Sequence, residues 1–461
     1  MQTPLSSKVK GALGSLGSLV TSAQRQRTPA ESPAGPGSRQ PYTDHYNFQL
    51  LATQKDIDTL RECQDREAAQ TARWQVYQQK GALPPKDELK KLCRKGVPPA
   101  LREWVWMEVS GATRRRQQHH SSYFAAMARI GKHESPFASQ IELDLPRTFP
   151  ANEWVQSEQG QVALRRVLCA FAKHKADVGY CQGLNYIAAM LLLAMGHDDE
   201  KAFWLLASLI DDDSEGILYQ DMFASNLSGT HVEMRSLWEL VQAKLPRLAA
   251  HLQAIKCDIS ILATDWFMCL FATTLPSETV TRVWDALFNE GPKLLFRCAL
   301  ALLKLHEGLL LAKQDPGELL QALRTASAES YDRDQLLKVA FGQVGSLPMT
   351  TIRRYRKQSQ QQVDHEMAMR ETNKNLQRAL REGFVMPPDE VHVLRDAELE
   401  SDAREEARAR GAWGHKLEVL SEKAKETVGK GKERLMHMTR AGSQGQIGGG
   451  PGTAAEPQPA A

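Results

Sequence analysis

The sequence lacks the motifs by which many enzymes hold a nucleotide, a metal ion or a covalent intermediate. Its 461 residues contain no Gly-x-x-x-x-Gly-Lys-[Ser/Thr] phosphate loop and no Gly-x-Gly-x-x-Gly after a strand. They also contain no Gly-x-Ser-x-Gly elbow and no His-Glu-x-x-His zinc motif. The thirteen histidines do not cluster at ligand spacing, so no metal site is predicted. A self-contained hydrolase, kinase or metalloenzyme is therefore disfavoured.

Cysteine pairs and a strong charge of one sign are missing as well. The seven cysteines are scattered and form no Cys-x-x-Cys pair, which signals neither a zinc site nor a disulfide framework. The formal net charge is only +3, so the sequence gives no reason to expect a nucleic-acid partner. A reducing, cytoplasmic setting fits this composition best.

No apolar run is long enough to predict a membrane span. The N-terminus has no continuous apolar segment of the kind that a secretory signal needs. The most apolar window, residues 178–196, carries Gln182 and Asn185, and its uninterrupted apolar part from Tyr186 to Met195 is too short to cross a bilayer. This window is predicted to be a buried core helix.

Composition divides the chain into a central globular part and polar flanks. Predicted segments are a disordered N-terminus (1–41), a helical lead-in (42–85), a globular domain (86–347), a charged helical extension (348–440) and a disordered tail (441–461). The N-terminal segment is rich in Ser, Gly, Pro and Ala, and the extension is dense in charge with few large apolar residues.

The globular domain is predicted to be all-α. Leu164, Val167, Leu168 and Phe171 recur at i, i+3, i+4 and i+7, which marks one face of a helix. The stretch after Pro276-Ser277 repeats this pattern as far as Gly291, and residues 294–311 read as a longer apolar helix. Period-two alternation bounded by hairpin turns is scarce, so this pattern disfavours a sheet.

Two flanking segments leave alternatives open. Val9, Leu13, Leu16 and Val20 recur at helical spacing, which fits a weak lipid-packing helix, a transit peptide or plain disorder. Residues 416–440 form a basic amphipathic segment, which fits a solvated helix or contact with a partner or membrane surface. Peripheral attachment to endomembranes is thus one expectation for localisation.

Three stretches place polar residues among apolar ones. In residues 141–150, Arg147 follows Asp144 by three positions between Pro146 and Pro150, so its guanidinium sits on a stiffened piece of backbone. Taken alone, such an Asp-x-x-Arg pair indicates an ordinary surface ion pair.

The second stretch, 179–185, reads Gly-Tyr-Cys-Gln-Gly-Leu-Asn and places Gln182 between two glycines where a helix begins. Its amide can donate to and accept from a water or a peptide group, although an ordinary helix-entry role is the simpler interpretation. In the third stretch, 96–106, the residues Gly-Val-Pro-Pro precede a predicted helix on which Arg102 and Trp106 share a face. This spacing favours an architectural role.

Together these stretches resemble the three sequence signatures of the TBC domain family. The matching patterns are residues 96–106 with Arg102 and Trp106, Ile141-x-x-Asp144-x-x-Arg147, and Tyr180-x-Gln182-Gly183-x-Asn185. They occur in the family's order, and the likeness covers roughly residues 86–347. Within the family, the chain looks closest to the growth-hormone-regulated TBC protein subgroup. Leu184 stands where methionine is frequent, which conserves volume.

The resemblance implies a fold, a partner and residue roles. The fold would consist of many packed helices in two subdomains with a groove between them. The family activates Rab-type small GTPases and so regulates vesicle trafficking. By resemblance, Arg147 would be the arginine finger and Gln182 the glutamine finger, both acting in trans on the GTPase.

The remaining signature residues would support these two. Asp144 would orient Arg147, whereas Tyr180, Gly183 and Asn185 would shape the turn that presents Gln182; Arg102, Trp106 and Ile141 would be structural. The chain would need no cofactor of its own, since GTP and Mg²⁺ arrive with the Rab partner, and it would hydrolyse no nucleotide alone. The alternative is a Rab-binding or scaffold module without catalysis.

Overall fold

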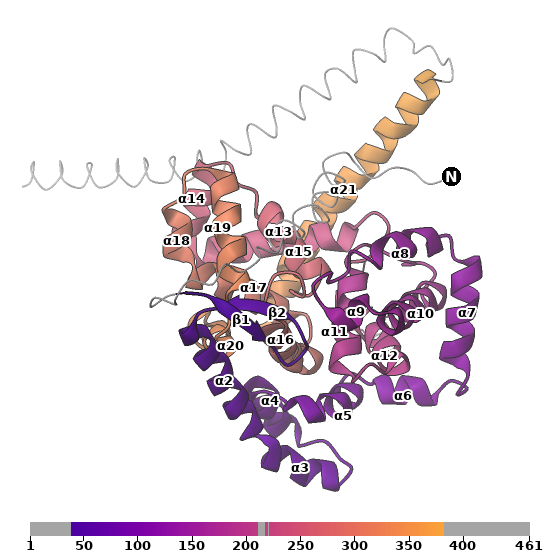
Figure 1. Ribbon diagram of the computed structural model, residues 1–461. Helices are drawn as coiled ribbons and strands as arrows, with labels where there is room; N and C mark the ends of the chain where they lie inside the picture. Colours follow the sequence, from indigo (N-terminus) through magenta and orange to yellow (C-terminus); the bar gives the residue numbers. More distant parts are fainter. Residues whose placement is uncertain (1–37, 211–216, 220, 382–461) are drawn as a thin grey trace, which may run out of the picture. The chain divides into compact units, whose positions relative to one another are not determined.

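The computed structural model describes residues 38–210, 217–219 and 221–381 (Figure 1). Several predictions fall on residues outside these ranges. They are the periodic segment 9–20, the charged extension beyond residue 381 with its basic segment 416–440, and the tail 441–461. The predicted disordered N-terminus lies outside them as far as residue 37.

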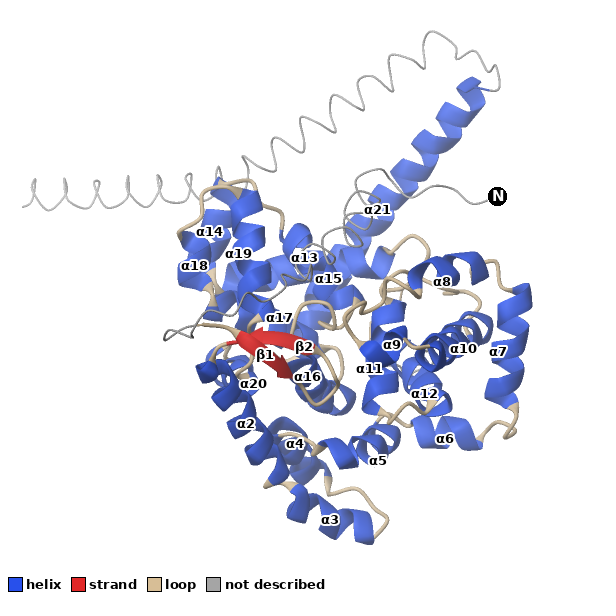
Figure 2. Cartoon of the chain, viewed as in Figure 1, coloured by secondary structure: helices blue, strands red, loops and turns tan. Residues whose placement is uncertain are grey.

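The described part of the chain is built almost entirely of helices, and the all-α prediction is confirmed (Figure 2). Its first elements are β1 (Gln40–Thr43), β2 (Gln49–Ala52), α2 (Gln54–Ala68), α3 (Thr71–Gln79), α4 (Lys86–Lys95), α5 (Pro99–Val109), α6 (Ala112–Gln117), α7 (Tyr123–Glu134), α8 (Ala138–Asp144), α9 (Glu153–Gln156), α10 (Glu158–His174), α11 (Leu184–Ala194) and α12 (Asp199–Ile210). The elements that follow are α13 (Ser228–Lys244), α14 (Pro246–Ala254), α15 (Ile259–Met268), α16 (Ser277–Glu290), α17 (Lys293–Leu305), α18 (Glu307–Leu311), α19 (Pro316–Ala328), α20 (Arg333–Lys338), the π-helical turn η1 (Val339–Gln343) and α21 (Met349–Arg381).

A short antiparallel hairpin, which the sequence pattern did not predict, opens the described chain. Strands β1 and β2 pair from Gln40 opposite Ala52 to Thr43 opposite Gln49. The Asp44 carboxylate closes the turn by accepting the backbone N–H groups of Tyr46 at 2.9 Å and Phe48 at 2.8 Å. Four-residue strands are too short for their alternation to stand out, and the segment 42–85 becomes helical only from α2 onward.

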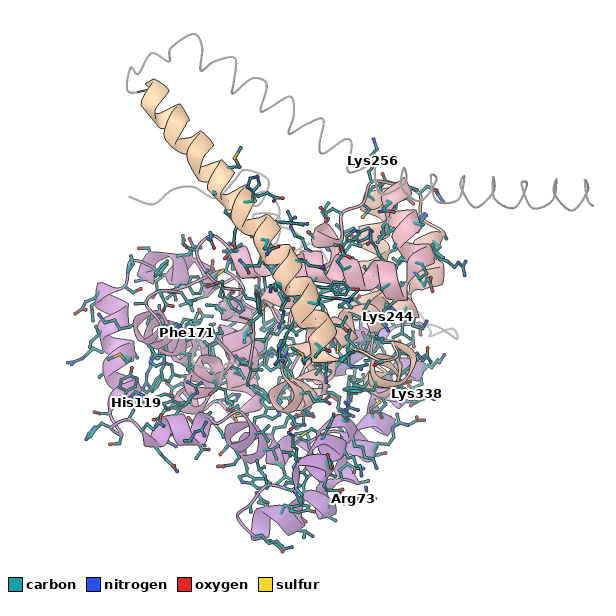
Figure 3. All side chains as sticks on the ribbon, turned by 180° about the vertical axis from the view of Figure 1, so that it is seen from behind. Arg73, His119, Phe171, Lys244, Lys256 and Lys338 are labelled. Atoms are coloured by element: carbon teal, nitrogen blue, oxygen red, sulfur yellow. The ribbon has the colours of Figure 1, made fainter. Side chains whose placement is uncertain are left out.

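One group of helices packs around α10. This helix contacts α7, α8, α9, α11 and α12, and the predicted apolar face from Leu164 to Phe171 is buried. Phe171 lies in the interior of this group (Figure 3). Helix α11 is buried along its whole length, which confirms the predicted core helix in the window 178–196. Figure 1 shows α7, α8, α10 and α12 gathered on the same side of the molecule.

A second group packs around α16 and α17. Helix α16 begins at Ser277 after Pro276 and ends before Gly291, as the sequence predicts. The single helix predicted over 294–311 is instead two helices, since α17 ends at Leu305 and α18 starts at Glu307. Gly308 is the second residue of α18, and a glycine so close to the break disfavours one continuous helix.

A buried charge cluster joins α5, the hairpin turn and α16. The Asp285 carboxylate accepts hydrogen bonds from Nε of Arg102 at 3.0 Å and from Nε1 of Trp106 at 2.9 Å. The guanidinium of Arg102 also donates to the hydroxyl of Tyr46 at 2.6 Å, and the backbone N–H of Val97 donates to Asp285 at 2.9 Å. The free-energy cost of burying these charges is offset only because they are paired and hydrogen-bonded.

The first half of α21 packs onto the second helix group. Ile352 and Val363 are buried, and Arg356 forms a buried two-point ion pair with Glu233 of α13, at 2.9 and 2.5 Å. By its internal contacts the chain divides into residues 1–369 and 370–461, so the division falls within α21. The domain limits predicted from composition, including the one at residue 347, stay predictions.

Within the described ranges, no helix combines the length and the apolar character that crossing a membrane requires.

Candidate functional site

Arg147 lies in the turn that follows α8. Its guanidinium forms an ion pair with the carboxylate of Asp144, the last residue of that helix. The Asp144 side chain is fully buried, whereas 34% of the Arg147 side chain is exposed. The pair therefore reaches from the core to the surface. The Asp-x-x-Arg spacing alone indicated an ordinary surface ion pair. This pair differs from one because its carboxylate is fully buried.

The Asp144 carboxylate is held from more than one side. The hydroxyl of Tyr180 donates to its Oδ2 at 2.5 Å, and Nε2 of Gln140 donates to its Oδ1 at 3.2 Å. Burial raises the pKa of Asp144, and the hydrogen bond from Tyr180 and the charge of Arg147 oppose this effect. Burial, and then the adjacent Asp144 charge, raises the pKa of the Tyr180 phenol well above its usual value, so the phenol remains a donor.

Gln182 lies one residue before the N-cap of α11, and its side chain is half-buried. The next residue, Gly183, has φ of +114°, a conformation that L side chains rarely adopt. A Cβ atom there would lie 2.8 Å from the carbonyl oxygen of Met268 at the end of α15. The side-chain oxygen of Asn185 accepts the N–H of Gly183 at 3.1 Å. Only glycine fits this turn. The turn therefore fixes the position of the Gln182 backbone, from which its side chain extends.

Hydrogen bonds tie the Arg147 and Gln182 segments together. The hydroxyl of Thr148 donates to the carbonyl of Asp144 and accepts from Nδ2 of Asn185, both at 2.7 Å. The hydroxyl of Tyr186 donates to the carbonyl of Arg147 at 3.4 Å. With the bond from Tyr180 to Asp144, these contacts hold residues 144–148 against residues 180–186. The structure thus brings two of the three sequence stretches into a single network.

Thr148 and Tyr186 are the members of this network that sequence reasoning missed. Each directly follows a predicted site residue in the chain, namely Arg147 and Asn185. Adjacency was the only available signal, because their contacts cross between segments 37 and 39 residues apart. Nothing in their spacing distinguishes them from ordinary core residues.

The third stretch lies elsewhere. Arg102 and Trp106 contact Asp285 in the buried cluster rather than the residues around Arg147. Ile141 is fully buried on α8, one turn before Asp144. No group of three or more His, Cys, Asp or Glu residues in the described ranges could hold a metal ion. The site therefore offers a partly exposed cation held by a buried carboxylate, and an uncharged amide, that of Gln182, on a segment hydrogen-bonded to the Arg147 segment.

Comparison with known proteins identifies the family. Residues 99–311 match the sequence profile of the Rab-GTPase-TBC domain. Human growth hormone-regulated TBC protein 1 is 33% identical over 339 residues, and the match covers 72% of this chain and 96% of that protein. The chain belongs to the TBC domain family. The resemblance read from the three signatures is thereby confirmed, and all of Arg102, Arg147 and Gln182 lie inside the matched residues.

The chain is also similar to a TBC domain of known structure and to a longer TBC protein. The crystal structure of the Chlamydomonas flagellar RabGAP TBC domain shares 45% sequence identity and a TM-score of 0.61, and the match covers 65% of this chain and 99% of that one. Mouse TBC1 domain family member 2A is 39% identical over 287 residues, which are 62% of this chain. The chain spans only 31% of the length of that relative.

Proposed function

We propose that this TBC protein is a GTPase-activating protein for a Rab-family small GTPase, with Arg147 and Gln182 acting in trans. The observation that carries the proposal is the network that joins their two segments. It holds a partly exposed guanidinium on a buried carboxylate, next to the turn that presents a glutamine. A protein that only binds its partner has no need to pair these two side chains.

Phosphoryl transfer from GTP needs little covalent chemistry from the protein, but it needs a cation at the developing charge and an aligned water. In this proposal Arg147 supplies the cation, which for comparable systems accelerates hydrolysis by about 10³–10⁵-fold. Gln182 donates to and accepts from the attacking water through its amide. GTP and Mg²⁺ come with the GTPase, which agrees with the absence of a phosphate-loop motif from the sequence.

The proposal also names the setting. A protein that acts on Rab-type GTPases would work in the cytoplasm at endomembranes and regulate vesicle transport. Peripheral contact with the membrane is part of this proposal, and the segments 9–20 and 416–440 are its candidates on sequence grounds. Flotation of the full chain and of forms lacking either segment with liposomes tests that part separately.

The activity is tested by single-turnover GTP hydrolysis across a panel of Rab proteins. We expect the wild type to accelerate hydrolysis by at least one Rab, and Arg147→Ala and Gln182→Ala to lose most of this effect. Arg116→Ala is a matched control, because it also removes a partly exposed, ion-paired arginine, here bound to Glu200 at 2.9 Å. If both finger variants keep full activity, the two-finger assignment is wrong.

Affinity for a transition-state mimic separates catalysis from plain binding. A catalyst binds the transition state more tightly than the ground state. The wild type should therefore prefer a Rab loaded with GDP and aluminium fluoride over one loaded with a non-hydrolysable GTP analogue, and Arg147→Ala should lose that preference. Equal affinity for the two forms, with no acceleration of any Rab, would instead identify a binding or scaffold module.

A further inference from the structure

The turn that carries Arg147 has a strained backbone two residues further on. Phe149 has φ of +45°, in the left-handed region, and it directly precedes Pro150. A bulky residue rarely adopts this conformation, and the residue before a proline is normally extended. A strained conformation persists only where surrounding contacts hold it. The contacts around Phe149 therefore determine the course of residues 145–152, which we call the Arg147 turn.

Two aromatic rings hold the buried ring of Phe149. The ring of Phe48, in the turn of the N-terminal hairpin, lies edge-to-face with it at 5.1 Å between centroids. The ring of Tyr186, on α11, contacts it in a similar way at 5.2 Å. Both distances are those of favourable aromatic pairs. Since the hydroxyl of Tyr186 also donates to the carbonyl of Arg147, the strained residue and the arginine share one set of contacts.

The hairpin also holds the end of the Arg147 turn, through Asn152. This side chain is fully buried, and its Nδ2 donates to the carbonyl of Tyr46 in the hairpin turn at 2.8 Å. Its Oδ1 accepts the N–H of Val155 at 3.0 Å and so caps the start of α9. The backbone N–H of Asn152 donates to the carbonyl of Phe149 at 2.9 Å. A single buried amide thus ties the strained residue, the next helix and the hairpin together.

The hairpin itself is anchored to α16, in the second helix group (Figure 1). The hydroxyl of Ser277 donates to the buried carboxylate of Asp44, and the backbone N–H of His45 donates to the carboxylate of Glu278 at 3.0 Å. The hairpin turn therefore joins α16 to the Arg147 turn. It lies outside residues 99–311, which match the family profile, so the profile assigns it no role.

From these contacts we infer that the hairpin is a positioning element for Arg147 and that Phe48 is its positioning residue. The inference rests on the proposed function and adds to it the part of the chain that fixes the backbone of the arginine. The Asp144 carboxylate restrains the guanidinium, whereas Phe48 acts through Phe149 on the backbone that carries it. Without the Phe48 ring, Phe149 is free to relax toward extended backbone, and Arg147 moves with it.

The first test needs no GTPase and measures hydrogen exchange of the full-length chain by mass spectrometry. The reporters are the amides of Thr148 and Asn152, both of which are hydrogen-bonded within the Arg147 turn. In Phe48→Ala they should exchange about tenfold faster, the factor that corresponds to the loss of one aromatic pair. The matched control is Tyr42→Ala, which removes another half-buried ring of the hairpin; its hydroxyl accepts from Gln64 of α2 at 3.3 Å. This control should leave both amides unchanged.

The second test is single-turnover GTP hydrolysis with a responsive Rab, in which the maximal rate is separated from the half-saturating concentration of the TBC protein. Phe48→Ala should lower the maximal rate about tenfold or more and leave the half-saturating concentration unchanged, because a displaced arginine affects the transition state. Phe48→Tyr, which keeps the ring, and Tyr42→Ala should keep the wild-type rate.

The inference and the proposed function fail in different ways. Unchanged exchange in Phe48→Ala overturns the inference, as does an equal effect of Tyr42→Ala in either test. Faster exchange with a wild-type rate shows that the hairpin holds the Arg147 turn without positioning the arginine, which also overturns it. If the wild type accelerates no Rab, the proposed function fails, while the exchange measurement still decides whether the hairpin holds the Arg147 turn.

Discussion

Replacing Asp144 with asparagine tests whether this carboxylate serves Arg147 or the stability of the fold. Asp144→Asn keeps the shape of the side chain and removes its charge. The carboxylate now accepts hydrogen bonds from Arg147, Tyr180 and Gln140 while fully buried. The change acts on two quantities, the free energy of unfolding and the rate of GTP hydrolysis, and the structure predicts different magnitudes for them.

The expected loss of stability is small because two contributions oppose each other. Hydrogen bonds to a charged group contribute about 1.5–3 kcal/mol each, and the amide weakens those from Arg147 and Tyr180. The variant, however, no longer buries a charge, which is the main cause of the raised pKa of Asp144. We expect a net loss below about 2 kcal/mol, measured by urea unfolding.

The expected loss of activity is large. Arg147 is partly exposed, so Asp144 is its main restraint, and a displacement of about 1 Å costs on the order of 100-fold in rate. Single-turnover hydrolysis with a responsive Rab should therefore slow by about 100-fold. Tyr180→Phe, which removes one donor to Asp144 and keeps the ring, should cause a smaller loss in the same direction.

Glu142→Gln is the matched control, because it makes the same chemical change in an exposed ion pair of α8, with Arg165 at 2.5 Å. Exposed pairs contribute little, so neither stability nor activity should change appreciably. Activity within threefold of the wild type in Asp144→Asn would refute the role of Asp144 in holding Arg147. A loss of stability above about 4 kcal/mol would show instead that the carboxylate is mainly structural.

Two further changes probe the turn that follows Gln182 and the carboxylate of Asp44, which is buried in the turn of the hairpin. Gly183→Ala should lower both activity and the unfolding midpoint, because its Cβ would lie 2.8 Å from the Met268 carbonyl oxygen. The control Gly196→Ala, at φ of +61° with open space around it, should cost only about 1 kcal/mol of stability. Equal effects of the two changes would contradict the crowding argument. Burial raises the pKa of Asp44 to about 6, so below that pH the folded state binds a proton that the unfolded state does not yet bind. As pH falls from 7 to 4, the wild type should therefore gain up to about 3 kcal/mol of stability relative to Asp44→Asn, and a constant difference in urea unfolding across that range would disprove the raised pKa.

Much of the fold was predictable from local pattern. The stripe from Leu164 to Phe171, the buried helix α11 and the limits of α16 all follow from apolar spacing and from proline and glycine signals. The hairpin was missed because its strands are four residues long, and α17 was extended too far because its apolar pattern continues past His306 into α18. Pattern shows which face is buried better than it shows where the backbone bends.

The candidate site was predictable only as far as the family likeness reached. The signatures named Asp144, Arg147, Tyr180 and Gln182, and their roles at the site remain proposals. Thr148 was not named, although it bonds both segments, because a threonine beside an arginine carries no pattern of its own.

The sequence alone determined the helical class, the family signatures and the absence of common nucleotide-binding and zinc motifs. These depend on neighbours within a turn or two of helix, where spacing sets which side chains share a face. The tertiary structure alone decided that Asp144 is buried while Arg147 stays partly exposed, and that Asn185 reaches Thr148. Burial and contact across 37 residues depend on how helices pack, and packing is a property of the whole chain.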